Sequence, residues 1–205
     1  MQNEYVTLTL YHGCDETRQT RDIKFPGPRE NCDFGAGFYL AASKQTAEEW
    51  VLRESTPVIN SYNFKAKAKS ILHLSGEDWI RVVVGFRTRA FRVAFKSPIV
   101  CGTIADDRMD IALAAFIDET LGDKRLLEAL NYCKLGNQYL LRDSSECLSF
   151  SESYELKGQE LQRAESRWHS RRKGMDVFVK SLFKKPVDGE KYLSDYIAGG
   201  DYVEL

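Results

Sequence analysis

Short β-forming segments recur at uneven intervals along this chain of 205 residues, and their spacing constrains the fold more than any other feature. Each combines β-branched or aromatic residues with apolar positions in the pattern of a strand. Strands are expected at residues 4–11, 57–64, 69–74, 97–104, 137–142 and 146–150, with a short apolar run at 38–40. Amphipathic stretches predict helices at residues 43–54, 76–86, 106–117 and 123–132. Because the two kinds of element do not alternate regularly, the sequence predicts an α+β fold rather than a parallel βαβ sheet.

The composition supports a folded chain with a substantial core. Hydrophobic residues make up 43% of the chain and aromatic residues 12%, which argues against intrinsic disorder. A net charge of −1 argues against a wholesale polyanion binder, although it allows a local basic patch. No apolar run approaches the roughly 20 residues of a membrane helix, and residues 1–13 do not have the pattern of a signal peptide. We therefore expect a cytoplasmic protein with no membrane partner.

Cysteine and histidine usage narrows the possible chemistry. The five cysteines are widely spaced and include no C-x-x-C, which indicates reduced thiols rather than disulfides or a zinc site. With only three histidines, we expect no metal centre. The chain also contains no G-x-G-x-x-G that opens a helix after a strand and no G-x-x-x-x-G-K-[ST]. The usual dinucleotide and triphosphate cradles are therefore absent.

Two segments carry recognisable motifs. In the first, a predicted strand ends in His12-Gly13, and the second is FGAGFYLA at residues 34–41. Together they resemble the ADP-ribosyltransferase superfamily, in its His–Tyr–Glu branch. Over roughly residues 6–156 the chain also resembles a narrower bacterial and phage group of unknown function in that superfamily. The motifs that carry this resemblance are DFGAGFYLAASKQTAEEW, VINSYNF, DWIRVVVGFR, IVCGTIADDR, KLGNQYLL and SESYEL.

The resemblance implies both a fold and an activity. It implies a split β-sandwich with helices packed around it, and mono-ADP-ribosyl transfer from NAD to a macromolecular target, either protein or nucleic acid. Members of the narrower group are often the toxin of a toxin–antitoxin pair, which implies an antitoxin partner or a role in phage conflict. Two alternatives stay open: an NAD glycohydrolase, and a catalytically weak module that binds a nucleotide or a partner protein.

The resemblance also implies which residues bind NAD. His12 would donate a hydrogen bond to the adenosine ribose, and the backbone of Gly13 would read the nicotinamide carboxamide. Gly37 permits the tight backbone before Tyr39, whose ring would stack on the positively charged nicotinamide. Arg29 would pair with the pyrophosphate through its planar guanidinium. The alternatives are a structural histidine, an ordinary core tyrosine and a solvated loop arginine.

The implied catalytic residues are Tyr39, Gln138, Asp106 and Asp107. Gln138 stands where the superfamily usually has a glutamate, and it offers no negative charge to the oxocarbenium-like transition state. A Gln138→Glu change is therefore expected to raise NAD cleavage. Asp106 and Asp107 are the candidate bases that activate the acceptor, with a helix N-cap as the alternative for one of them.

The charge pattern divides the chain near residue 156. Residues 1–156 are the expected ADP-ribosyltransferase-like domain, and residues 157–205 a charged, partly helical extension. Residues 157–185 hold nine Lys or Arg against three Asp or Glu. This basic tract either faces solvent or captures nucleic acid or an acidic antitoxin. If the shortened chain folds, removing residues 157–205 is expected to leave NAD cleavage intact.

Overall fold

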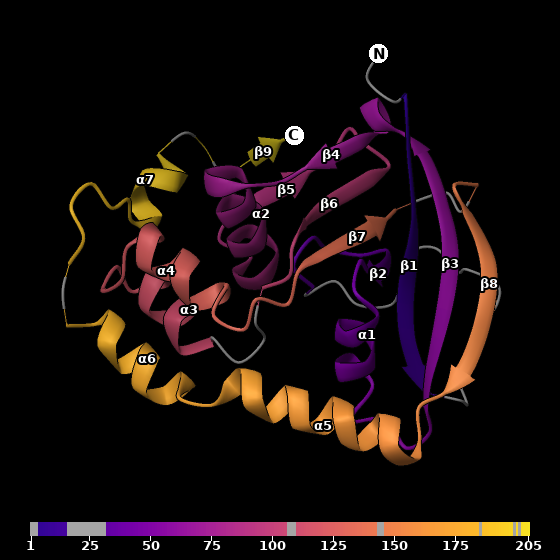
Figure 1. Cartoon of the computed structure of the whole chain (residues 1–205). Coiled ribbons are helices and arrows are strands. Elements are labelled where there is room, and N and C mark those ends of the chain that lie inside the picture. Colours follow the sequence, from indigo (N-terminus) through magenta and orange to yellow (C-terminus); the bar gives the residue numbers. More distant parts are fainter. Residues whose placement is uncertain are drawn as a thin grey trace.

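The computed structural model describes residues 4–15, 32–105, 110–142, 146–184, 186–198, 200 and 202–205 (Figure 1). Its strands are β1 (Tyr5–Asp15), β2 (Phe38–Ala41), β3 (Pro57–Lys67), β4 (Ile71–His73), β5 (Arg92–Ala94), β6 (Ile99–Thr103), β7 (Asn137–Leu141), β8 (Leu148–Glu155) and β9 (Tyr202–Glu204). Its helices are α1 (Lys44–Trp50), the 3₁₀ turn η2 (Ala68–Ser70), α2 (Gly76–Thr88), α3 (Asp110–Ile117), α4 (Asp123–Leu130), α5 (Gly158–Arg172), α6 (Met175–Leu182) and α7 (Leu193–Ile197). Within these described residues, no helix is both long and apolar enough to cross a bilayer.

Seven strands form one mixed sheet in the order β4-β6-β7-β2-β1-β3-β8. The β4–β6 pair is parallel, and the other neighbouring pairs in this order are antiparallel. Strand β1 pairs with β3 along its whole length, but it meets β2 at a single register position, Tyr11 opposite Ala41. The sheet therefore consists of two halves, β4-β6-β7-β2 and β1-β3-β8, joined at a narrow seam between β1 and β2.

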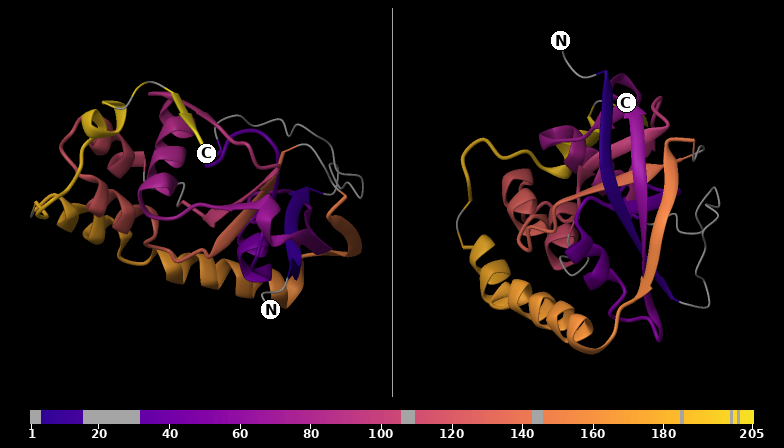
Figure 2. Two further views of the ribbon diagram at one scale, coloured as in Figure 1. Left: turned by 90° about the horizontal axis from the view of Figure 1, so that it is seen from above. Right: turned by 45° about the vertical axis from the view of Figure 1, so that its right-hand side comes forward.

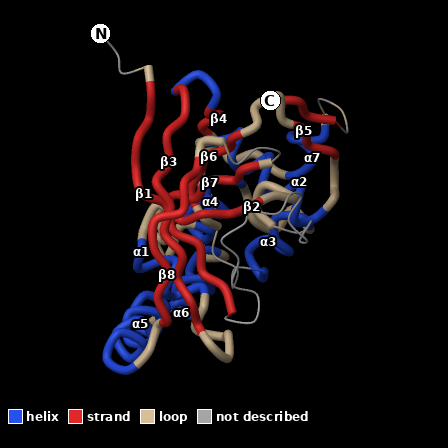
Figure 3. Tube along the Cα trace, turned by 90° about the vertical axis from the view of Figure 1, so that its right-hand side faces the viewer, coloured by secondary structure: helices blue, strands red, loops and turns tan. Residues whose placement is uncertain are grey.

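On one face of this sheet, side chains from the strands themselves pack together in a buried cluster. A buried apolar cluster combines Leu10 of β1 and Tyr62 of β3 with Ile99 of β6 and Tyr139 of β7. Strands that are far apart in the strand order share this cluster, so the sheet must curl for them to meet. Figure 3 shows the strong twist that accompanies this curl.

Helices cover the outer face of the sheet. Helix α2 buries Trp79, Ile80 and Val83 on one side, with the spacing of an amphipathic helix, in a core cluster that includes Val100 of β6 and residues of α3 and α4. Helices α1 and α5 pack against the other half through a separate cluster. In Figures 1 and 2, α5 and α6 run one after the other along one side of the molecule.

The α+β class and the predicted strands and helices are confirmed, with shifted ends. The first strand runs on to Asp15, so His12-Gly13 lies inside β1 and the prediction of a strand end there is wrong. Helix α3 is described over Asp110–Ile117, and residues 106–109 of the predicted helix lie outside the described residues. Strands β5 and β9 and helix α7 were not predicted, since each is only three to five residues long.

The C-terminal residues pack onto the rest of the chain. Strand β9 pairs with β5, and Tyr196 of α7 belongs to the core cluster of α2 and α4. Arg125 of α4 forms a buried ion pair with Glu190, at 2.7 Å between Nη2 and Oε2. The Tyr196 hydroxyl donates to Asp123 Oδ2 at 2.9 Å. Removing residues 157–205 would expose this core, so we do not expect the shortened chain to fold.

Part of the basic tract lies in an internal contact between α5 and α1. Arg167 forms an ion pair with Glu48, whose carboxylate also accepts from the Tyr154 hydroxyl at 3.1 Å. Arg171 Nε lies 3.4 Å from Glu49 Oε1. Burial raises the pKa of Glu49, and the neighbouring arginines oppose that rise. These two arginines therefore bind α5 to α1 rather than facing solvent freely.

The buried ion pair gives a test of how the C-terminal residues are held. Arg125→Met is expected to lower the free energy of unfolding by about 3–5 kcal/mol, because it leaves the Glu190 carboxylate buried without its partner. The matched control is Lys191→Met, which removes an exposed ion pair with Glu77 from the same segment and costs at most about 1 kcal/mol. Urea unfolding measures both values, and equal losses would contradict the role given to the buried pair.

Candidate functional site

The seam between β1 and β2 is bridged by a histidine side chain. His12 Nδ1 donates to the main-chain oxygen of Tyr39 at 2.8 Å, and the imidazole lies against the Phe38 ring, with centroids 4.5 Å apart. Burial lowers the pKa of His12, although its bond to Tyr39 opposes that shift. The neutral ring with a proton on Nδ1 leaves Nε2 as an acceptor. His12 can therefore accept a hydrogen bond from a ribose hydroxyl, in the direction opposite to the sequence-based expectation.

Tyr39 is locked by its hydroxyl to the turn that precedes β2. The hydroxyl donates to Gly35 O at 2.7 Å and accepts from Phe34 N at 3.0 Å. Burial is the largest cause of the raised pKa of Tyr39, so the phenol stays protonated. Phe38 and Tyr39 belong to different apolar clusters, which confirms that neighbouring side chains face opposite sides of β2. The Tyr39 ring thus lies on the side of α2, away from the His12 imidazole.

Gln138 lies on the same side of the sheet as Tyr39, at the start of β7. Its side chain is buried, and Nε2 donates to Asp33 Oδ2 at 2.6 Å. Asp33, itself buried, also accepts from the Ala105 main-chain N at 2.9 Å. Arg87 of α2 completes the group through two bonds to Asp33 Oδ1, at 2.8 Å from Nε and 2.5 Å from Nη2. The predicted residue is therefore part of a hydrogen-bonded network rather than an isolated amide.

Two of the predicted glycines are required by close packing. A Cβ atom at Gly13 would lie 2.3 Å from Val51 Cγ1 and 2.9 Å from Ala47 O, because α1 rests directly on the β1 backbone. At Gly37, where φ is 157°, a Cβ atom would lie 2.6 Å from Leu141 O. Both glycines are explained by contacts within the protein. Their predicted contacts with NAD stay predictions.

The structure brings together only some of the predicted residues. Tyr39 and Gln138 lie on adjacent paired strands, and His12 joins them through the Tyr39 carbonyl. Arg29, Asp106 and Asp107 lie outside the described residues. Sequence reasoning missed Asp33 and Arg87 as site residues. The one sequence signal for Asp33 was its place immediately before the glycine-rich turn, although its hydrogen-bond donors come from distant segments of the chain.

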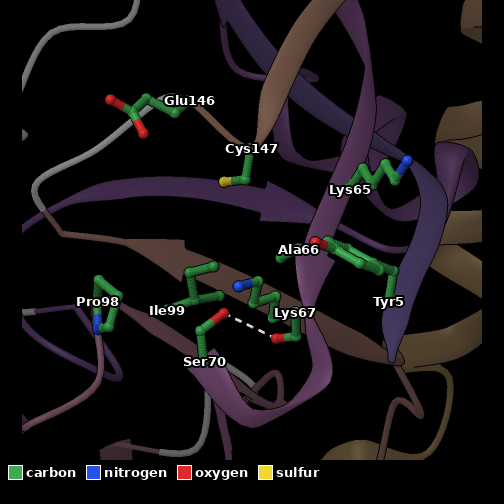
Figure 4. A pocket seen from close by; sticks show the side chains of 9 residues that line it. All are labelled: Tyr5, Lys65, Ala66, Lys67, Ser70, Pro98, Ile99, Glu146 and Cys147. Carbon is green, nitrogen blue, oxygen red and sulfur yellow. Dashed lines mark hydrogen bonds between the residues drawn. The ribbon is translucent and has the colours of Figure 1, made fainter. Parts of the chain in front are cut away.

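A separate cavity of about 280 Å³ lies at the other end of β1 (Figure 4). Its lining residues are Tyr5, Lys65, Ala66, Lys67, Ser70, Pro98, Ile99, Glu146 and Cys147. Tyr5 and His12 are seven residues apart on one strand, which corresponds to roughly 23 Å at the usual rise per residue. This cavity is therefore separate from the group formed by His12, Tyr39 and Gln138.

Comparison with known proteins gives a family and no activity. A family model described as "Protein of unknown function (DUF3990)" matches residues 8–150, which includes His12, Tyr39 and Gln138. No curated protein and no solved structure matches the chain.

Substitution at Gly13 tests the packing of α1 on β1. Gly13→Ala is expected to lower the free energy of unfolding by about 1–3 kcal/mol, because the added methyl group overlaps Val51 and the Ala47 carbonyl. Combining it with Val51→Ala removes one of the two close contacts, so the double loss should be smaller than the sum of the single losses. Urea unfolding of the three variants measures this coupling. A Gly13→Ala variant as stable as the parent would contradict the predicted packing.

Proposed function

We propose that this chain, which belongs to the DUF3990 family, is an NAD-dependent mono-ADP-ribosyltransferase that modifies a macromolecular acceptor. The observation that carries the proposal is the connected set His12, Tyr39 and Gln138. These residues come from three separate segments, and they are joined through the Tyr39 carbonyl and the β2–β7 pairing. The narrow seam between the two halves of the sheet also supports the split β-sandwich that the superfamily resemblance implies.

Each of these residues has a defined role in the proposed complex, in which NAD crosses the seam because the His12 imidazole lies on the opposite side of β2 from Tyr39 and Gln138. His12 Nε2 accepts a hydrogen bond from a hydroxyl of the adenosine ribose. The Tyr39 ring, fixed by its hydroxyl, stacks on the positively charged nicotinamide. The Gln138 carbonyl oxygen accepts from the 2′-hydroxyl of the nicotinamide ribose. Arg29 pairs with the pyrophosphate in the proposal, on the strength of the superfamily resemblance.

The proposed reaction is a displacement at C1′ of the nicotinamide ribose. The bond between C1′ and the nicotinamide nitrogen breaks, and both electrons leave with nicotinamide, which departs as a neutral molecule. A nucleophile on the acceptor then forms a bond to C1′ and loses its proton. Asp106 or Asp107 is the proposed base for that proton, a role typically worth ~10²–10⁴-fold in rate. The proposal assigns the protein a toxin role in the cytoplasm, with an antitoxin as its partner.

The neutral amide at position 138 also fits a second candidate function. An amide stabilises a developing cation less than a free carboxylate does. NAD binding without turnover, or slow hydrolysis in which water replaces the acceptor, is therefore the competing proposal. Incubation with NAD and cell lysate separates the three cases by mass spectrometry. Transfer adds ADP-ribose to a macromolecule, hydrolysis yields free ADP-ribose, and binding alone yields neither product.

Thermal unfolding tests NAD binding at this site. NAD at about ten times its dissociation constant is expected to raise the melting temperature by about 3–6 °C, because it binds the folded chain alone. Tyr39→Ala should abolish most of this shift. Phe38→Ala is the comparison: its side chain faces the strand-lined core and packs on His12, so it should lower the starting melting temperature yet retain more of the NAD shift than Tyr39→Ala does. The reverse order, or no shift with millimolar NAD in the parent, would contradict the assigned site.

A further inference from the structure

We propose that Asp33 is a positioning residue that requires an amide at position 138, so that the Asp33–Gln138 pair acts as one unit. The evidence for the Asp33–Gln138 pair is the geometry of two buried side chains. The effect of this pair on NAD turnover rests on the proposed function. The neutral Gln138 side chain is therefore not a simple loss of negative charge from the site. The negative charge is carried instead by Asp33, whose carboxylate accepts from Gln138 Nε2.

The hydrogen bonds of Asp33 determine which way the Gln138 amide points. Asp33 is 5% exposed and accepts two bonds on each carboxylate oxygen: from Arg87 on Oδ1, and from Ala105 N and Gln138 Nε2 on Oδ2. Every one of these partners is a donor, as an ionised carboxylate requires. The nitrogen of Gln138 must therefore face Asp33, and its oxygen must point the other way.

The Gln138 oxygen is thereby held as an acceptor. Among the described residues, no group donates to Gln138 Oε1. Donation from Nε2 to an anion polarises the amide and strengthens its oxygen as an acceptor. Asp33 thus supplies negative charge to the site indirectly, through Gln138, while Arg87 holds the carboxylate in place.

The same contact explains why glutamate is unsuitable at this position. In a Gln138→Glu variant, two carboxylates would face each other where Nε2 and Oδ2 now lie 2.6 Å apart. Two carboxylates at such a distance cannot both ionise without strong repulsion. We therefore revise the sequence-based expectation: Gln138→Glu alone should destabilise the protein and should not raise NAD cleavage.

A double-mutant cycle on thermal unfolding tests the pair without NAD. Asp33→Asn and Gln138→Glu are each expected to lower the melting temperature by about 4–8 °C at pH 8. In the double variant the amide introduced at position 33 can donate to the carboxylate introduced at position 138. The combined loss should therefore be at least about 2 °C smaller than the sum of the single losses. Recovery is partial, because the Ala105 N–H loses its charged acceptor. Additive losses would overturn the pairing.

The pH dependence of Gln138→Glu gives a readout that a purely steric defect would not. Among the described residues, Asp33 contacts the Gln138 side chain, Arg87 contacts Asp33, and the Tyr39 hydroxyl interacts electrostatically with Asp33, Arg87 and Cys32. In the folded Gln138→Glu variant, the carboxyl groups at positions 33 and 138 share one proton. They hold that proton more tightly than the unfolded chain does. Stability should therefore fall as pH rises from about 4.3, the usual value for glutamate, through the raised folded pKa. A melting deficit that does not change between pH 5 and pH 8 would contradict this assignment.

A matched control and an activity assay separate this inference from the proposed function. Asp15 is also buried and pairs with Ser55, so Asp15→Asn combined with Gln138→Glu should give additive losses. If the parent cleaves NAD, Asp33→Asn should lower kcat at least about tenfold and change KM much less, as loss of a pre-positioned acceptor predicts. If Asp33→Asn instead raises KM by as large a factor as it lowers kcat, Asp33 acts as a binding group and its positioning role is overturned. If the parent does not cleave NAD, the proposed function fails while the cycle still decides the pairing.

Discussion

The carboxylate of Asp33 is the interaction on which the arrangement around the site depends. A buried charge is costly unless donors surround it, and Asp33 takes its donors from helix α2, from Ala105 two residues after β6 and from strand β7. Satisfying one side chain therefore fixes three elements relative to the turn before β2. That turn is closed in addition by the Tyr39 hydroxyl, so the ring of Tyr39 and the amide of Gln138 are held by linked contacts.

The relation between the two halves of the sheet depends on fewer contacts. Main-chain pairing joins β1 to β2 at Tyr11 and Ala41, and beyond that point the His12 side chain bonds the Tyr39 carbonyl. Helix α1 packs directly on the β1 backbone at Gly13, and it is covered in turn by α5 through the Glu48–Arg167 ion pair. Residues of the C-terminal segment therefore support the seam from outside, although they supply none of the predicted NAD contacts.

The sequence predicts local structure well where a periodic pattern is long enough. The alternation in β2 assigned Phe38 to the core and Tyr39 to the opposite face, and the helix carrying Trp79 was recognised from its apolar spacing. Long-range partners leave no such pattern. The partners of Asp33 lie 54, 72 and 105 residues away, so a carboxylate in a turn gave no sign of its network. For the same reason the sequence allowed Arg167 to be interpreted as part of a solvent-facing basic tract. Its partner Glu48 lies 119 residues away along the chain.

Hydrogen–deuterium exchange with and without NAD tests the central claim most directly, namely that NAD binds where β1, β2 and β7 meet. The account predicts slower exchange on addition of NAD in peptides covering residues 10–14, 33–41 and 136–140. Peptides covering residues 65–70 and 146–148, around the distant cavity, should exchange at unchanged rates. Protection confined to the cavity, or no protection at saturating NAD, would contradict the account.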